Sequence, residues 1–206
     1  MIFIQHRVNK LSDLAKISNE HGVEIDVRYH ENELILHHDP FKHHQTDPVK
    51  LKTFLKHWKN DGFIILNIKT EGIEQLCIKL MKQFQIKNWF FLDLSMPAMV
   101  KYSLESLDIS KAISPSNLAI RFSEYEPIEY ALSFEGRAKW LWVDCFNHLP
   151  LTDSIYVKIK KANFKICIVS PELQNHPIEN IKNYKHKISG MEIDAICTKR
   201  PDLWAD

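Results

Sequence analysis

Residues 22–27 read Gly22-Val23-Glu24-Ile25-Asp26-Val27, an apolar strand pattern that carries two acids. Side chains two positions apart on a strand point to the same side of a sheet, so Glu24 and Asp26 share one face. Two ionised carboxylates that lie side by side inside a protein repel each other and lose hydration. A strand of this kind predicts a buried sheet with a polar site on one face.

Similar short runs, rich in Ile, Val, Phe and Trp, recur along the chain. Together with the quoted segment they number eight: Ile2–Gln5, Val23–Val27, Phe63–Ile68, Trp89–Leu94, Leu118–Phe122, Trp140–Cys145, Lys165–Val169 and Met191–Cys197. Parallel strands have this continuous apolar pattern because both of their faces are covered. Apolar residues at helical spacing between the runs predict helices over Leu11–Asn19, Val49–Trp58, Ile73–Phe84, Met96–Leu104, Ile155–Ala162 and Ile178–Tyr184.

Alternating strands and helices predict right-handed βαβ units, and eight strands favour a (β/α)₈ TIM barrel as one domain over residues 1–206. Such barrels usually need about 250 residues, so some helices must be short or absent. The short loop from Asp39 to Pro48 leaves no room for an inserted lid domain. An open doubly wound sheet is the alternative fold. It needs a glycine-rich turn after its first strand, and no glycine lies near His6.

Composition argues against several classes of protein. The formal net charge of +1 provides no overall field for nucleic acid or an anionic membrane. No apolar stretch approaches the ~20 residues of a membrane span, and residues 1–7 lack the regions of a signal peptide. We therefore expect a cytoplasmic protein with a small-molecule partner, in which the four cysteines are buried free thiols. No feature of the sequence indicates an oligomeric state.

Polar side chains stand at the ends of these runs, where TIM-barrel enzymes place their active sites. The candidates from these ends are His6, Arg7, Glu24, Asp26, His38, Asn67, Lys69, Asp93, Arg121, Asp144 and Glu172. A bound divalent cation would relieve the repulsion between Glu24 and Asp26, and ligands that are all oxygens suit Mg²⁺ or Ca²⁺. Alternatively, the two acids form a structural ion-pair network with Arg7, Arg28 or Lys69.

Histidines are the candidates for proton transfer, since imidazole titrates near pH 6.5. His6 and His38 flank the carboxylate pair in the sequence. His37 and His38 are adjacent, and an extended chain sends their side chains to opposite sides, so only one of them can face the site. His30, His43 and His44 are expected in surface loops.

Two further motifs extend this pattern into a family resemblance. His6-Arg7, the quoted segment, and Leu36-His37-His38-Asp39 resemble the glycerophosphodiester phosphodiesterase family, within the phosphatidylinositol phospholipase C-like barrel superfamily. Ile196-Cys197-Thr198-Lys199-Arg200-Pro201 is similar to the last strand of that family. Other segments resemble a sub-group associated with bacterial surface polysaccharide clusters; they are residues 66–72, 93–97, 121–126 and 169–173.

The resemblance implies roles for individual residues. It makes His6 and His38 the acid–base pair, which selects His38 over His37. Glu24 and Asp26 would bind the metal, and Arg7 would contact the phosphate. The family usually has a third acidic ligand where this chain has Asn67. An amide oxygen can bind Mg²⁺ or Ca²⁺ but brings no charge, so the affinity for metal should fall unless an additional acid, Asp93 or Glu172, compensates.

The leading hypothesis is a metal-dependent phosphodiester hydrolase that acts on a glycerophosphodiester or sugar phosphodiester, in lipid or polysaccharide metabolism. The family implies attack by a neighbouring hydroxyl of the substrate and a cyclic phosphate that water then opens. Arg7 and Lys69 would hold the phosphate, and Arg121 is a possible additional site residue. Two alternatives are a non-catalytic barrel that binds a phosphorylated sugar and a metal-dependent sugar isomerase or lyase.

Overall fold

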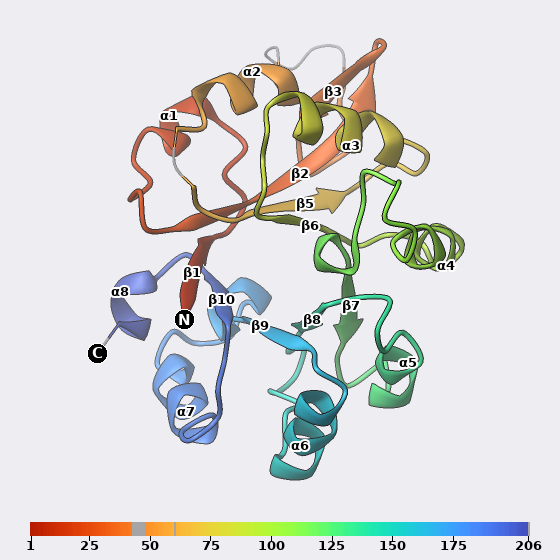
Figure 1. Cartoon of the computed structure of the whole chain (residues 1–206). Helices are drawn as coiled ribbons and strands as arrows, with labels where there is room; N and C mark the ends of the chain where they lie inside the picture. The colour runs from red at the N-terminus through yellow and green to blue at the C-terminus, as the bar shows by residue number, and fades with distance from the viewer. Residues whose placement is uncertain (43–47, 60, 206) are drawn as a thin grey trace.

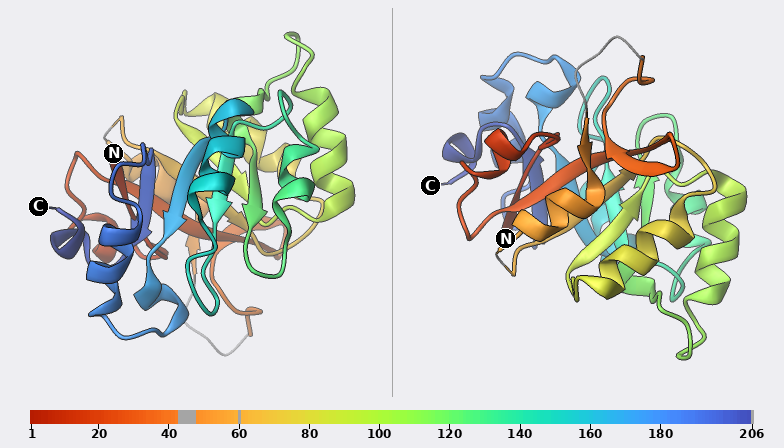
Figure 2. Two further views of the ribbon diagram at one scale, coloured as in Figure 1. Left: turned by 90° about the horizontal axis from the view of Figure 1, so that it is seen from below. Right: turned by 90° about the horizontal axis from the view of Figure 1, so that it is seen from above.

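The computed structural model describes residues 1–42, 48–59 and 61–205, and it confirms the barrel. Eight parallel strands surround the core, and the helices lie outside them (Figures 1 and 2). The strands are β1 (Ile2–Gln5), β2 (Gly22–His30), β5 (Ile64–Ile68), β6 (Trp89–Leu92), β7 (Ala119–Phe122), β8 (Trp140–Val143), β9 (Lys165–Val169) and β10 (Ala195–Thr198). Each of the eight predicted runs therefore overlaps one barrel strand.

Strand pairing runs in the order β6-β5-β2-β1-β10-β9-β8-β7, with every neighbouring pair parallel. The register places Asp26 beside Asn67. Between β6 and β7 the barrel closes through a single bridge, Phe91 to Leu118. The Asn117 side chain reinforces this seam, because its amide donates a hydrogen bond of 3.0 Å to the carbonyl oxygen of Trp89.

Short helices keep the barrel small. They are α1 (Leu11–Leu14), α2 (Leu51–His57), α3 (Glu74–Gln83), α4 (Met96–Glu105), α5 (Ile128–Leu132), α6 (Asp153–Lys161), α7 (Asn180–Lys187) and α8 (Pro201–Trp204), with 3₁₀ turns η1 (Pro115–Asn117) and η2 (Pro171–Gln174). β3 (Glu33–Leu36) extends β2 as an antiparallel hairpin, and β4 (Val49–Lys50) pairs with β3. Across the described residues, none of the helices has the length and apolar character needed to cross a membrane.

Several predicted boundaries were wrong, and three of them are explained by local contacts. The helix over Leu11–Asn19 stops at Leu14, and i+3 turns follow as far as Ile17. Ser18 then accepts a hydrogen bond from the amide of Glu20, a local bond that competes with helix formation. At the other end of the chain, Met191 continues a turn by donating to the carbonyl of Ile188, so β10 begins only at Ala195.

The third error is the start of α2: residues 49 and 50 form β4, and α2 begins at Leu51. Helices α5 and α8 were not expected at all, because each is too short to show a helical apolar period. His30 was expected in a loop but forms the last residue of β2, where it pairs with Glu33 of β3. His43 and His44 lie outside the described residues.

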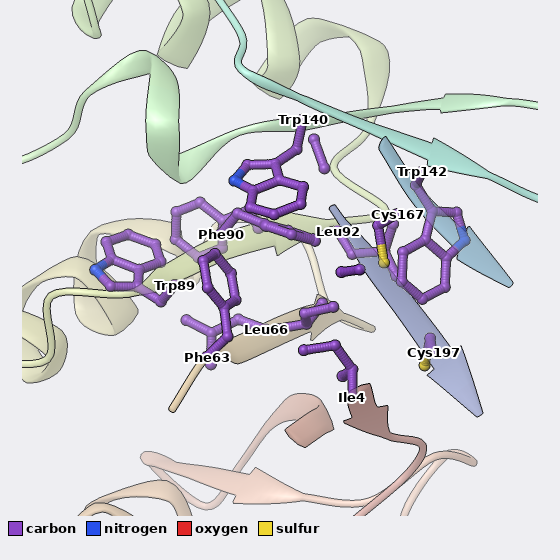
Figure 3. Close-up of a cluster of buried hydrophobic side chains, with 14 of the residues drawn as sticks. Ile4, Phe63, Leu66, Trp89, Phe90, Leu92, Trp140, Trp142, Cys167 and Cys197 are labelled. Atoms are coloured by element: carbon purple, nitrogen blue, oxygen red, sulfur yellow. The ribbon is translucent and has the colours of Figure 1, made fainter. Parts of the chain in front are cut away.

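Aromatic rings fill the end of the barrel where the strands begin (Figure 3). The Trp140 ring lies 5.1 Å from that of Phe63 and 5.2 Å from that of Phe90, measured between centroids. Gly22 is needed at the edge of this cluster, because a Cβ there would lie 2.5 Å from the Ile4 side chain and 2.6 Å from the carbonyl oxygen of Phe63. This packing closes one end of the barrel, so a polar site can form only at the opposite end. The four cysteines are buried free thiols, as expected.

Candidate active site

A cavity of about 210 Å³ opens at the carboxyl ends of the strands. The predicted residues that line it are His6, Arg7, His38, Asn67, Lys69, Asp93, Arg121 and Asp144. Trp142 and Gln174, which were not predicted, also line it. Strands far apart in the sequence therefore bring most of the candidates to one place.

Glu24 and Asp26 lie beside this cavity and are each 1% exposed. One oxygen of each carboxylate is satisfied: Glu24 Oε2 accepts from the amide of Arg7 at 2.7 Å, and Asp26 Oδ2 accepts from the amide group of Asn9 at 2.8 Å. The other oxygens, Glu24 Oε1 and Asp26 Oδ1, are buried without a hydrogen-bond partner among the described residues. The side-chain oxygen of Asn67, on the neighbouring strand, is also unpartnered there.

Asn9 is a site residue that the sequence did not reveal. Its side-chain oxygen also accepts from the main-chain amide of Asp26 at 2.9 Å, so the two residues bond reciprocally. This contact holds Asp26 in one orientation and leaves Oδ1 3.8 Å from the amino group of Lys69, a residue that lines the cavity. The only signal in the sequence is an amide residue three positions after His6.

The electrostatics of the site show that ionising Glu24 beside Asp26 is unfavourable in the absence of added positive charge. Burial, together with the charge of Asp26, raises the pKa of Glu24 to about 7, although the Asn67 side chain, the Arg7 amide and the Lys69 charge act in the opposite direction. A carboxyl group that is hard to ionise next to another carboxylate is a position where bound positive charge is stabilising.

The donor set fits Mg²⁺ or Ca²⁺ by its chemistry. It consists of three unpartnered, buried oxygens, two from carboxylates and one from an amide. It is also a weak set: within residues 1–42, 48–59 and 61–205, no cluster of three His, Cys, Asp or Glu side chains is placed to hold an ion. The third oxygen of the set comes from Asn67, an amide that brings no charge, and not from a third acidic side chain.

His6 lies over the acid pair, with its Nε2 3.7 Å from Glu24 Oε2. Burial lowers the pKa of His6 to about 3, and the positive charges of Arg7, Lys199, His38 and Lys69 act in the same direction. His6 is therefore neutral at physiological pH. Its Nδ1 has no hydrogen-bond partner in the described part of the chain.

His38 and His37 separate as an extended chain requires. His38 lines the cavity, and its Nδ1 lies 2.8 Å from a carboxylate oxygen of Asp39. His37 instead contacts the main-chain oxygen of Asp39 and the ring of Phe41. The bond to His38 also lowers the pKa of the Asp39 carboxyl. A carboxylate partner of this kind holds the imidazole ring of His38 in one orientation.

Arg7 and Lys69 supply positive charge at this end of the cavity. Arg7 Nε lies 3.6 Å from Asp26 Oδ2, and Lys69 Nζ lies 3.8 Å from Asp26 Oδ1. Arg7 has a φ of 57°, an uncommon backbone conformation for arginine. Its main-chain amide can therefore bond Glu24 while its side chain lies over Asp26.

Arg28 does not pair with the acids in any contact that the structure describes. Its guanidinium group donates from Nη2 to the carbonyl oxygen of His38 at 2.7 Å and from Nη1 to that of Lys69 at 3.1 Å. One side chain therefore ties together the main chain at two cavity residues, in the segments that follow β3 and β5.

The far end of the cavity is a network centred on Arg121. Its guanidinium group donates to Asp93 and, at 2.8 Å, to Asp144. Asp93 also accepts from Lys69 at 3.3 Å, so it joins the two ends of the cavity. Asp93 has a φ of 60°, a conformation in which aspartate is enriched.

Glu172 is placed apart from these groups. Its Oε1 accepts from the Thr198 hydroxyl at 2.5 Å and from the Lys199 amide at 3.0 Å, and its Oε2 accepts from Ser170. It does not line the cavity. The expectation that Asp93 or Glu172 supplies a missing acidic ligand receives no support from these contacts, since both carboxylates are engaged elsewhere.

Solved structures share this fold over the whole chain. Glycerophosphodiester phosphodiesterase from Agrobacterium tumefaciens matches with a TM-score of 0.70 at 14% identity, covering 100% of both chains. A glycerophosphoryl diester phosphodiesterase from Parabacteroides distasonis matches with a TM-score of 0.69 at 11% identity, covering 99% of this chain and 84% of that one. The glycerophosphodiester phosphodiesterase of Thermotoga maritima matches with a TM-score of 0.66 at 18% identity, covering 99% of this chain and 96% of that one.

At these identities the likeness shows the fold, and activity is a separate question. No family model matches the chain, and no curated protein matches it.

Proposed function

We propose that this protein is a metal-dependent phosphodiester hydrolase that acts on a glycerophosphodiester or a sugar phosphodiester. The observation that carries the proposal is the convergence of four buried atoms beside one cavity, each without a hydrogen-bond partner among the described residues: His6 Nδ1, Glu24 Oε1, Asp26 Oδ1 and Asn67 Oδ1. Buried polar atoms are seldom left without partners unless they serve a ligand. The activity of the proteins that share the fold supports the same reaction.

Phosphate binding falls to the cations at this end of the cavity. Arg7 presents a planar fork that suits two phosphate oxygens, whereas Lys69 acts as a point charge. Glu24, Asp26 and Asn67 would hold Mg²⁺ or Ca²⁺, which when bound supplies positive charge to stabilise the charge that develops on the phosphate.

Proton transfer falls to the two histidines. Burial and the positive charges of Arg7 and Lys69 lower the pKa of His6 in the free protein, and a bound phosphodiester anion offsets those charges, so that His6 can accept the proton of the attacking hydroxyl. His38, held by Asp39, donates a proton to the oxygen of the leaving alcohol. The phosphorus–oxygen bond to the leaving group breaks as the bond to the nucleophile forms. His6 then carries the proton of the nucleophile, and the proton lost by His38 is on the released alcohol.

A second candidate is a non-catalytic barrel that binds a phosphorylated sugar. Asn67 favours it, because a third ligand without charge weakens the metal site. The link to polysaccharide biosynthesis and the cytoplasmic location remain parts of the proposal.

Hydrolysis of bis(4-nitrophenyl) phosphate with added Mg²⁺ or Ca²⁺ tests the proposal. We expect His6→Ala and His38→Ala each to lower kcat by at least about 100-fold, the usual contribution of a positioned acid or base. His57→Ala is the matched control, since His57 lies on α2 and bonds only the Thr53 carbonyl in the described contacts. Equal activity in all three variants would refute the proposed catalytic pair.

Titration calorimetry of the metal alone gives a readout that does not depend on turnover. We expect Asp26→Asn to weaken binding of Mg²⁺ or Ca²⁺ and Asn67→Asp to strengthen it by about tenfold, as a charged ligand replaces a neutral one. Metal binding and phosphosugar binding without hydrolysis would favour the second candidate. Unchanged binding in both variants would refute the metal site.

A further inference from the structure

Two exposed aromatic side chains stand next to the Arg121 end of the cavity. Tyr125 is 71% exposed and Phe146 is 36% exposed, and their ring centroids lie 5.8 Å apart. The Phe146 ring lies 5.8 Å from the guanidinium carbon of Arg121. Two neighbouring exposed rings at the rim of a polar cavity differ from the single apolar residues scattered on any protein surface.

The loop that carries Phe146 is held in place from both sides. Glu124 accepts hydrogen bonds from the main-chain amides of Phe146, Asn147 and His148, at 3.2, 2.7 and 2.6 Å. His176 Nε2 lies 3.1 Å from the carbonyl oxygens of Cys145 and Phe146. The Asn147 side chain also donates to the Tyr125 hydroxyl at 2.8 Å. The ring pair is therefore preorganised, which reduces the entropy lost when a ligand binds to it.

Charge at this end of the cavity argues against a second anion. Arg121 is paired with Asp93 and Asp144, and Glu126 lies 3.9 Å from its Nε. Three carboxylates therefore face one guanidinium group. The Arg7 and Lys69 end remains the place for phosphate, and the Arg121 end suits an uncharged group that donates hydrogen bonds to carboxylates.

The acceptors at this end are fixed as well. Asp144 is 2% exposed and accepts from Arg121, from the Cys145 amide at 2.9 Å and from the Gln174 side chain at 2.7 Å. Gln174 lines the cavity, and its side-chain oxygen accepts no hydrogen bond in the described contacts, so it can accept a hydroxyl hydrogen from a ligand. Polar groups in the cavity and aromatic rings beside Arg121 suit a ring that has hydroxyl groups on its edge and C–H groups on its face.

We propose that Tyr125, Phe146 and the Arg121 network form a subsite for an uncharged, hydroxylated ring, which is the alcohol on one side of the scissile phosphate. The inference rests on the proposed function and narrows its substrate class to diesters in which one alcohol is a cyclic polyol or a sugar. Asp93 contacts both Lys69 and Arg121, so a ring attached to a phosphate at Lys69 reaches this subsite without a linker.

The test compares two diesters, glycerophosphoinositol for the ring and glycerophosphoglycerol for the acyclic alcohol. We expect the wild type to prefer the ring diester by about fivefold or more in kcat/KM, the range of one or two aromatic contacts. Phe146→Ala and Tyr125→Ala should each remove most of that preference and leave kcat/KM for the acyclic diester within about twofold. Tyr29→Ala is the matched control, because Tyr29 is 42% exposed on the β2–β3 hairpin, away from the cavity lining.

Calorimetry with the corresponding non-hydrolysable phosphonate diesters separates this inference from the proposed function. Tighter binding of the ring phosphonate that depends on Phe146 supports the subsite, even if neither diester is hydrolysed; in that case only the hydrolase proposal fails. Equal affinity for the two phosphonates, or equal losses for both in Phe146→Ala, overturns the subsite even if both diesters are hydrolysed. Failure of both phosphonates to bind also overturns it.

Discussion

Arg28 holds two main-chain carbonyls with one guanidinium group, and both belong to residues of the candidate site. It touches neither the cavity nor the acid pair in the described contacts, so it acts by positioning His38 and Lys69. A displacement of about 1 Å at such residues can lower activity by up to about 100-fold.

Arg28→Lys tests this role. Lysine keeps the charge but has no planar fork, so it cannot hold both carbonyls in the same geometry. If the protein is the proposed hydrolase, we expect kcat to fall about tenfold, and the free energy of unfolding to fall by only about 1 kcal/mol. Steady-state kinetics and urea denaturation measure the two effects.

Arg137→Lys is the matched control, since Arg137 also donates to a main-chain carbonyl, that of Ser133, away from the cavity. A loss of stability with unchanged kcat in Arg28→Lys would limit Arg28 to a structural role.

Residues differ in how well their roles can be predicted from the sequence. The alternation in residues 22–27 places Glu24 and Asp26 on one face, and that follows from strand geometry alone. Asn9 and Arg28 could not be predicted in the same way. Their roles depend on partners 17 and 41 positions away, and these become neighbours only when the strands pair.

At the scale of elements, strands were predicted better than helices. A buried parallel strand shows itself in four or five apolar residues, whereas a helical period needs about three turns to be distinct. The five residues of α5 and the four of α8 are below that length. Loops such as the one after β8 gave no signal, because main-chain hydrogen bonds to Glu124 define its shape.

The loop after β8 makes stability depend on pH through Glu124. Burial would raise the pKa of Glu124, but hydrogen bonds from the amides of His148 and Asn147 outweigh that effect and lower it. A group with a lowered pKa in the folded state stabilises the fold above its unfolded pKa of about 4.5, and this contribution is lost as the pH falls through the folded value.

We expect Glu124→Gln to lower the free energy of unfolding by about 1–2 kcal/mol at pH 7, since an amide cannot accept all three main-chain hydrogen bonds. The difference from wild type should shrink below about pH 4.5. Urea denaturation between pH 3 and pH 7 measures it, with Glu20→Gln on an exposed turn as the control. A difference that stays constant across this range would contradict the role assigned to the Glu124 charge.

At the scale of the whole molecule, the barrel is continuous except at the β6–β7 seam. A single bridge and the Asn117 side chain close that seam. Eight apolar runs predicted the closed barrel. The sequence of a run does not indicate which two neighbouring strands will form the fewest hydrogen bonds. That depends on how the β6–β7 connection fits the barrel.

Asn117→Ala tests the seam. Its loss leaves the Trp89 carbonyl without this donor and removes the bonds that Asn117 accepts from Ser114, so we expect a loss of about 1–3 kcal/mol in the free energy of unfolding. Amide hydrogen exchange should accelerate in β6 and β7 but not in β1 and β10.

Asn88→Ala is the matched control, because Asn88 makes a comparable amide-to-carbonyl bond to Asp61 at the surface. Uniform acceleration of exchange in all strands would show that the seam does not open independently.

Strands β1 and β10 are neighbours in the barrel, so the barrel can close only after β10 has been translated. Ile2 pairs with Ala195 and Gln5 with Thr198, so one edge of the first strand has no partner until nearly all of these residues have been translated. An apolar strand edge that stays open for so long can associate with other nascent chains. The interval between translation of the two strands is therefore the time during which this protein most needs chaperones.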